Sequence, residues 1–226
     1  MVILLAPGAV GALVGVLVGE ALGAVAAGAA LAAAAAVTLA AAARQEVGSP
    51  MLTKPKTILR HLWLDASDSE RAIPPDMLAR LTQRVAASEA RHSGEIRIYV
   101  EAALPMSYLW RLGPSTPMAQ LVRQRATMIF GKLRVWDTEH NNGVLIYLQL
   151  AEHAIEIVAD RGVNGRVSAQ EWQTMTERMA GAFKNQQFED GLTQAIGEVT
   201  GVLVEHFPSA PDGKATNELP DEPVLG

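Results

Sequence analysis

Two apolar segments separated by only three residues restrict this chain to a fold built around a β-sheet. Residues 143–150 form an almost unbroken apolar run, which is typical of a central strand covered on both faces. Residues 154–159 form a second strand-like run. A three-residue connection is too short for a crossover, so we expect an antiparallel hairpin. Residues 95–101 alternate polar and apolar side chains, which predicts a third strand with one buried face.

Helical periodicity accounts for most of the remaining sequence between residues 75 and 207. The expected helices cover about 76–91 and 117–133, begin again at Ser168, and end with 188–207. We expect Asp76 and Thr116 to cap the first two of these helices. Ser168 and Glu171 have the spacing of a capping box at the start of the third.

The order helix, strand, helix, strand, strand, helix, helix fixes the fold class. A helix between the first two strands requires a crossover, so these strands should be parallel with a right-handed connection. The sequence therefore predicts a three-layer α/β/α domain at 75–207. Its small mixed sheet combines one parallel crossover with one antiparallel hairpin.

The segments on either side of the domain have a different composition. Residues 44–74 are expected to be a linker that contains a short amphipathic helix at 57–64, followed by a polar break at 65–70. Residues 208–226 are acidic and contain four prolines. This composition predicts a disordered acidic tail.

Residues 1–43 are an Ala/Gly-rich apolar segment with 18 Ala, 6 Gly and a single ionisable side chain, Glu20. A helix crosses a bilayer with about 20 apolar residues, so this apolar helical segment is predicted to be a membrane helix, or a hairpin that turns near Glu20. Basic residues follow the segment and none precedes it. The positive-inside rule then predicts a membrane-associated protein with its domain on the cytoplasmic side.

A second interpretation of the N-terminus stays open. Met51 stands just before the first sequence of globular type, and Ala/Gly runs also arise as low-complexity sequence. If translation starts at Met51, residues 1–50 are a mis-assigned extension and the protein is cytoplasmic. The membrane is thus an expected partner only if residues 1–43 are translated.

Charge and cysteine content exclude several classes of function. The chain has no cysteine, which excludes a disulfide scaffold, a thiolate nucleophile and a Cys-ligated zinc or iron–sulfur centre. Residues 44–207 carry 18 basic and 19 acidic side chains. Because nucleic-acid binding needs a basic excess, we expect no nucleic-acid partner.

Several motifs together resemble one family, the TPM domain. They lie at Ser93–Arg97, Trp136–Thr138, Asn141–Ile146, Glu156–Gly162 and Phe188–Leu192, with a further stretch from Ile196 to Pro208. The resemblance covers roughly residues 55–208. It implies a Rossmann-like fold. It also implies one of two kinds of function, since some plant and bacterial members have been proposed to be phosphatases and others resemble accessory proteins of membrane complexes.

The sequence departs from the common secreted members of that family. Those members are organised as a signal peptide, a domain and a C-terminal membrane helix. In this chain the apolar segment precedes the domain and a polar tail follows it. The resemblance therefore does not extend to an extracytoplasmic role.

Oxygen-bearing side chains gather where the predicted hairpin begins and ends. Asp137, Asn141 and Asn142 precede its first strand, and Asp160 follows its second, so all four should meet at one edge of the sheet. Such oxygens suit Ca²⁺ or Mg²⁺, and a bound cation can orient a phosphate ester. We therefore predict these four residues as metal ligands, with Asp137 and Asp160 as the catalytic pair.

Two arginines complete the predicted phosphate site. Arg161 and Arg166 follow the hairpin and would bind the phosphate through their guanidinium groups, beside the start of the helix at Ser168. Ordinary turn and capping chemistry is the alternative explanation for the Asp and Asn residues. His92 likewise has two interpretations: a general base oriented by Glu95, or a cation at a helix C-terminus.

Two functions follow from these observations. The first is an accessory or binding module that acts with an unknown protein partner, such as a membrane complex. The alternative is a divalent-cation-dependent phosphatase that acts on phosphate esters at Asp137 and Asp160.

Overall fold

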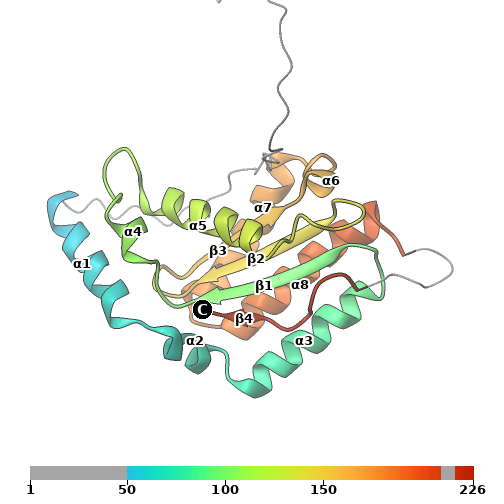
Figure 1. Cartoon of the computed structure of the whole chain (residues 1–226), viewed down its shortest axis with the longest axis horizontal. Coiled ribbons are helices and arrows are strands. Elements are labelled where there is room, and N and C mark those ends of the chain that lie inside the picture. Colours follow the sequence, from blue (N-terminus) through green and yellow to red (C-terminus); the bar gives the residue numbers. More distant parts are fainter. Residues whose placement is uncertain (1–49, 210–216) are drawn as a thin grey trace, which may run out of the picture. The chain divides into compact units, whose positions relative to one another are not determined.

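The computed structural model describes residues 50–209 and 217–226. The predictions for residues 1–43 lie outside this part of the chain. Within the described part, every helix is too short or too polar to cross a membrane. The described residues form one mixed sheet with helices on both of its faces (Figure 1).

The sheet contains four strands in the order β3-β2-β1-β4. They are β1 (Glu95–Glu101), β2 (Gly143–Gln149), β3 (Ala154–Ala159) and β4 (Val224–Leu225). β1 pairs with β2 in parallel, and β2 pairs with β3 in antiparallel orientation. The three predicted strands, the parallel crossover and the hairpin are therefore confirmed.

The tail forms the fourth strand, so the prediction of a disordered tail is wrong for residues 217–226. β4 pairs in parallel with the free edge of β1, with Tyr99 opposite Val224. The Glu95 carboxylate accepts the backbone N–H groups of Glu218 and Leu219 at 3.1 and 3.2 Å. Composition predicts disorder when apolar burial is scarce, but an open strand edge offers backbone partners to almost any sequence.

Eight helices are present in the described part of the chain. They are α1 (Pro50–Trp63), α2 (Ala66–Ala72), α3 (Pro75–Glu89), α4 (Met106–Leu109), α5 (Met118–Lys132), α6 (Arg161–Asn164), α7 (Ala169–Lys184) and α8 (Phe188–His206). Side chains of α3, α7 and α8 pack on one face of the sheet, and those of α4 and α5 pack on the other. β1 is consequently buried on both faces, where alternation predicted only one.

The helix starts differ from expectation in three places. Ser168 and Glu171 form the predicted capping box of α7. The N-cap positions of α3 and α5 are held by Pro74 and Pro117, so the predicted caps Asp76 and Thr116 are wrong. The supposed polar break at 65–70 is instead the N-cap and first part of α2, because Asp65 and Asp68 form a capping box of their own.

Candidate functional site

The start of β2 and the end of β3 meet at one edge of the sheet, which we call the hairpin rim (residues 137–143 and 160–162). The backbone N–H of Asp160 donates to the carbonyl of Gly143 at 2.9 Å, and that of Gly162 donates to the carbonyl of Asn141 at 3.0 Å. Gly143 is required here because a Cβ at this position would lie 1.9 Å from the carbonyl oxygen of Val135. Backbone contacts therefore hold the rim in a fixed geometry.

Asp160 is the most unusual side chain of the hairpin rim. It is 4% exposed and caps α6, since its Oδ1 accepts the N–H of Arg161 at 2.7 Å. Its Oδ2 is buried and has no hydrogen-bond partner among the described residues. Burial raises the pKa of the Asp160 carboxyl, although the N–H and guanidinium of Arg161 act in the opposite direction. An unpaired buried carboxylate oxygen is costly unless a donor or a cation reaches it.

Asn142 also leaves an oxygen without a partner. Its Nδ2 donates to the carbonyl of Ser93 at 2.9 Å, and its backbone N–H donates to Thr138 Oγ1 at 3.1 Å. Its Oδ1 is buried with no partner among the residues that the structure describes. The alternation of side chains along β2 and β3 places Asn142 on the α8 side of the sheet and Asp160 on the α5 side. The two free oxygens therefore belong to opposite faces.

The other predicted site residues have separate partners. Asn141 Oδ1 accepts from Arg161 Nε at 2.9 Å, which links these two residues directly. Asp137 is half exposed and forms an ion pair with Arg134 at 3.6 Å. The guanidinium of Arg166 lies 5.0 Å from the ring centre of Phe207. The structure thus brings Asn141, Asp160 and Arg161 together through direct contacts.

The fit of this arrangement to a divalent cation is partial. No group of three His, Asp or Glu side chains suited to a metal ion occurs in residues 50–209 and 217–226. The free Oδ2 of Asp160 supplies one hard oxygen of the kind that Ca²⁺ and Mg²⁺ prefer. Any cation held there would need most of its remaining ligands from water, the backbone or a bound molecule.

His92 belongs to a buried network that sequence reasoning missed. Its Nε2 lies 2.8 Å from Ser88 Oγ and its Nδ1 lies 3.0 Å from the carbonyl of Gly94. Ser88 Oγ in turn lies 2.5 Å from Thr200 Oγ1 on α8. Burial lowers the pKa of His92 to about 4, so the imidazole is neutral near pH 7. His92 is not a general base oriented by Glu95, because its ring nitrogens lie beside Ser88 and Gly94. It is also not a cation at the end of α3, because the imidazole is neutral.

The proton positions in this network follow from its geometry. A carbonyl only accepts, so the single N–H of the neutral imidazole points from Nδ1 to Gly94. His92 Nε2 must then accept the hydroxyl proton of Ser88. The separation of Ser88 and His92 by four residues at the end of α3 was visible in the sequence, whereas the contact with Thr200 is a tertiary one. A shallow groove of about 360 Å³ between α3 and α8 lies over Ser88 and Thr200, with Arg84 and Arg91 in its lining.

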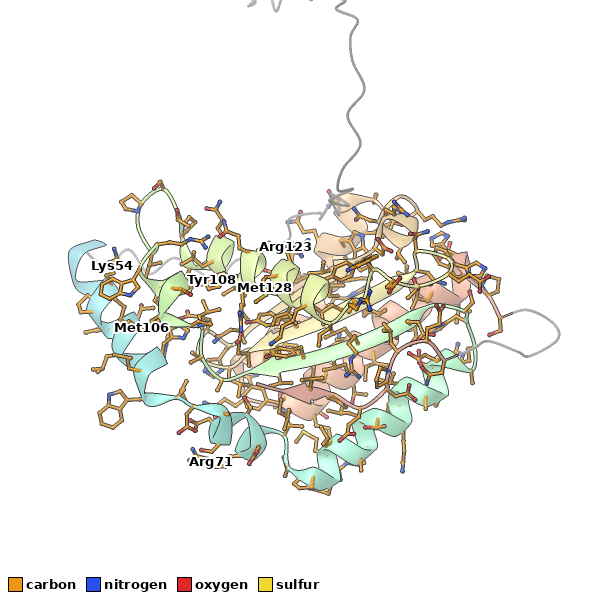
Figure 2. All side chains as sticks on the ribbon, in the orientation of Figure 1. Lys54, Arg71, Met106, Tyr108, Arg123 and Met128 are labelled. Atoms are coloured by element: carbon orange, nitrogen blue, oxygen red, sulfur yellow. The ribbon has the colours of Figure 1, made fainter. Side chains whose placement is uncertain are left out.

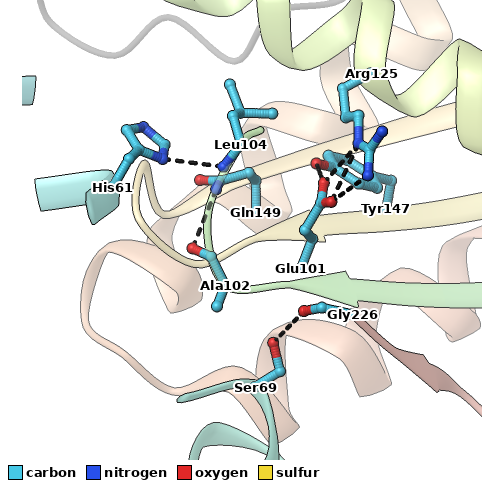
Figure 3. A network of polar contacts seen from close by, with 9 residues as sticks. All are labelled: His61, Ser69, Glu101, Ala102, Leu104, Arg125, Tyr147, Gln149 and Gly226. Carbon is cyan, nitrogen blue, oxygen red and sulfur yellow. Dashed lines mark hydrogen bonds and ion pairs between the residues drawn. The ribbon is translucent and has the colours of Figure 1, made fainter. Parts of the chain in front are cut away.

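A second buried network lies at the opposite end of the sheet, where β1 ends (Figure 3). Glu101 accepts the hydroxyl of Tyr147 at 2.6 Å and the Nε of Arg125 at 3.0 Å. Burial, together with the Glu101 carboxylate, raises the pKa of Tyr147 well above its ordinary value. Every charged group here has a partner, so this network ties α5 to the sheet and leaves no oxygen free for a ligand.

Comparisons with known proteins give a family and a similar fold. A family model described as the TPM domain matches residues 66–202. The NMR structure of the BA42 protein from the psychrophilic bacterium Bizionia argentinensis superimposes with a TM-score of 0.57 at 27% sequence identity. That match covers 68% of this chain and 95% of the BA42 chain. A comparison with curated proteins gave no match.

The family match spans more than half of the chain and contains the whole hairpin. It also includes three of the sheet's four strands, and the similarity to BA42 extends to the arrangement in space. From its sequence and its fold, the chain belongs to the TPM domain family.

Proposed function

We propose that this TPM domain is an accessory binding module whose ligand is recognised at the hairpin rim through Asp160. The observation that carries the proposal is the buried Oδ2 of Asp160, which lacks a partner among the described residues. In native proteins nearly all buried polar atoms are hydrogen-bonded, and each exception calls for an explanation such as a bound water, an ion or a catalytic role. A cation or a donor group would satisfy this oxygen.

The rest of the hairpin rim supports binding of a polar ligand. Arg161 is exposed, and its Nε donates to Asn141. The N–H groups of its two Nη atoms remain as donors for a ligand. A ligand that carries both a cation and an acidic group would meet Asp160 and Arg161 together. The unknown protein partner of such a module would present an acidic group to Arg161, together with a cation bound to Asp160.

Thermal unfolding with added Ca²⁺ or Mg²⁺ tests the proposal. A cation that binds only the folded chain raises the apparent melting temperature by mass action. Asp160→Asn keeps an oxygen for the α6 cap but removes the charge, so this variant should lose the cation effect. The control variant Asp190→Asn removes an exposed carboxylate on α8, and its melting temperature should still rise with the cation. An equal response of the parent and Asp160→Asn would refute a role of the Asp160 charge in cation binding.

A divalent-cation-dependent phosphatase is the second candidate. The closeness of Asp160 and Arg161 favours it, since a cation on one and a phosphate oxygen on the other would place a phosphate ester at the rim. Phosphate release from a simple aryl phosphate, measured with and without Mg²⁺, separates the two functions. Turnover that is lost in both Asp160→Asn and Arg161→Gln supports the enzyme. Cation binding without turnover supports the binding module.

Membrane anchoring through residues 1–43 remains part of the proposal. The apolar composition of that segment supports it. Fractionation of cells, followed by detection of the protein in the membrane pellet and the supernatant, tests it independently of the rim.

A further inference from the structure

One face of α1 is fixed against the domain. His61 is 4% exposed, and its Nδ1 accepts the backbone N–H of Leu104 at 3.0 Å (Figure 3). Its Nε2 lies 3.0 Å from the carboxylate of Glu152. Ile58 packs against the core cluster on the α5 side of the sheet. These contacts determine which way the remaining side chains of α1 point.

The solvent-exposed side of α1 carries large apolar side chains. Leu59, Leu62 and Trp63 are 54%, 59% and 79% exposed, and we call them the outer stripe. Their spacing of three and four residues puts them side by side on the helix surface. Single exposed apolar residues are common, but a contiguous group that includes Trp marks an interaction surface. Among the described residues nothing covers it.

Basic side chains accompany the outer stripe. Lys54, Lys56 and Arg60 are exposed on the same helix, and α1 contains no acidic residue. Arg60 forms an ion pair with Glu152, so the two lysines are the basic groups available to a partner. Figure 2 shows Lys54 on α1, at the end of the domain where Met106 of α4 also lies. A short helix with Leu and Trp on one side and Lys or Arg beside them has the composition of a helix that lies in a membrane interface.

The position of α1 in the chain points to the same partner. The part of the chain outside the structure on this side ends at residue 49, directly before α1. Its residues 1–43 are apolar enough to enter a bilayer. Only residues 44–49 separate this segment from the start of α1, so a bilayer that held the segment would lie near that helix.

We propose that the outer stripe of α1 lies in the headgroup region of a phospholipid bilayer, with anionic lipids paired to Lys54 and Lys56. Trp63 would sit at the headgroup level, where its amphipathic ring is favoured, and the two leucines would enter the acyl boundary. This contact orients the domain on the membrane. It does not depend on the hairpin rim or on any cation.

Tryptophan fluorescence of the full chain tests the contact directly. The double variant Trp110→Phe/Trp136→Phe keeps two tryptophans. Trp63 is exposed, and Trp172 is buried with 4% of its surface exposed. We expect vesicles of phosphatidylcholine and phosphatidylglycerol that carry bromine on their acyl chains to quench Trp63 and shift its emission to shorter wavelength. The effect should be weaker on pure phosphatidylcholine and at high salt.

A matched reporter separates the outer stripe from the apolar N-terminus. Trp63→Phe/Trp110→Phe leaves Trp136, which is 41% exposed and lies in the turn between α5 and β2. Trp136 should not be quenched, even if residues 1–43 bring the whole chain to the vesicles. Bound protein with unquenched Trp63, or equal quenching of both reporters, would overturn the proposal.

Substitutions in the outer stripe complete the test. Leu59→Ser with Leu62→Ser should weaken the lipid contact of Trp63 about tenfold or more, because the transfer of two leucines is lost. Met128→Ser, at a residue that is 37% exposed on α5, should leave it unchanged. A blue-shifted Trp63 that resists acrylamide without vesicles would mean that another part of the chain or a second copy covers the stripe, and would contradict the lipid assignment.

Discussion

Buried polar side chains in this domain divide into those with a partner and those without one. Ser88 and His92 satisfy each other within the fold, and the Thr200 hydroxyl lies within hydrogen-bond distance of both Ser88 Oγ and the carbonyl of Ile196. Asp160 and Asn142 each leave an oxygen with no partner in the described part of the chain. The first kind stabilises the fold, whereas the second kind is what a ligand site requires. Arg123 Nε, Gln124 Oε1, Trp172 Nε1 and Thr193 Oγ1 also lack a partner in the described residues, but of these atoms only Asp160 Oδ2 belongs to a carboxyl group. We therefore place the function at the hairpin rim and a structural role at His92.

The Ser88 network should be a source of stability. Ser88→Ala removes the hydroxyl that His92 Nε2 accepts and leaves a buried nitrogen without a partner. We expect the free energy of unfolding in urea to fall by about 1–3 kcal/mol. Ser107→Ala, at an exposed serine, is the control. An unchanged stability of Ser88→Ala would show that the network contributes little.

Glu89 should make stability depend on pH. Burial raises its pKa from 4.5 to about 8, and the carboxylates of Glu95 and Asp221 add to the shift. Between these values the folded chain keeps a proton that the unfolded chain has lost, so this group's contribution to stability is lost as the pH rises. Glu89→Gln cannot ionise. Its stability relative to the parent should therefore rise by roughly 1–4 kcal/mol from about pH 5 to about pH 8.

Chemical denaturation of both proteins at the two pH values measures this difference. A constant difference across the range would mean that Glu89 ionises normally in the folded state.

Strands and helices in this chain were predictable to different degrees. The apolar runs of β2 and β3 and the short link between them determine a hairpin locally, and the structure confirms it. β4 has only two residues and pairs with a strand more than a hundred residues away, so no local sequence pattern predicts it. The starts of α3 and α5 were misplaced because proline occupies the N-cap position without any side-chain hydrogen bond.

The β4 strand should be held mainly by its contacts with β1. Leu225 packs partly buried against the core, and the N–H of Gly226 donates to the carbonyl of Val100 at 2.9 Å. We expect Leu225→Asp to expose this N–H to rapid hydrogen exchange and to lower stability by about 1–2 kcal/mol. Glu222→Gln changes an exposed side chain and should preserve protection. Full protection in Leu225→Asp would show that the backbone pairing alone holds the strand.

For the whole molecule, the sequence predicted the fold class and the family but only part of the candidate site. Asn141, Asp160 and Arg161 come together because a hairpin must return its ends to one edge. Asp137 turns to Arg134 instead, and Asn142 faces α8. Side-chain direction at a strand end depends on the alternation of the final residues and on nearby partners, which the pattern of residue types does not reveal.

The central claim is that the hairpin rim binds a ligand through Asp160. The most direct measurement is a titration of the isotopically labelled chain with Ca²⁺ and with Mg²⁺, followed through the backbone amide signals in NMR spectra. We expect the first and largest shifts at residues 138–143 and 160–163, and no such shifts in Asp160→Asn. Shifts centred on the carboxylates around Glu89, Glu95 and Asp221, or shifts that persist in Asp160→Asn, would contradict the claim.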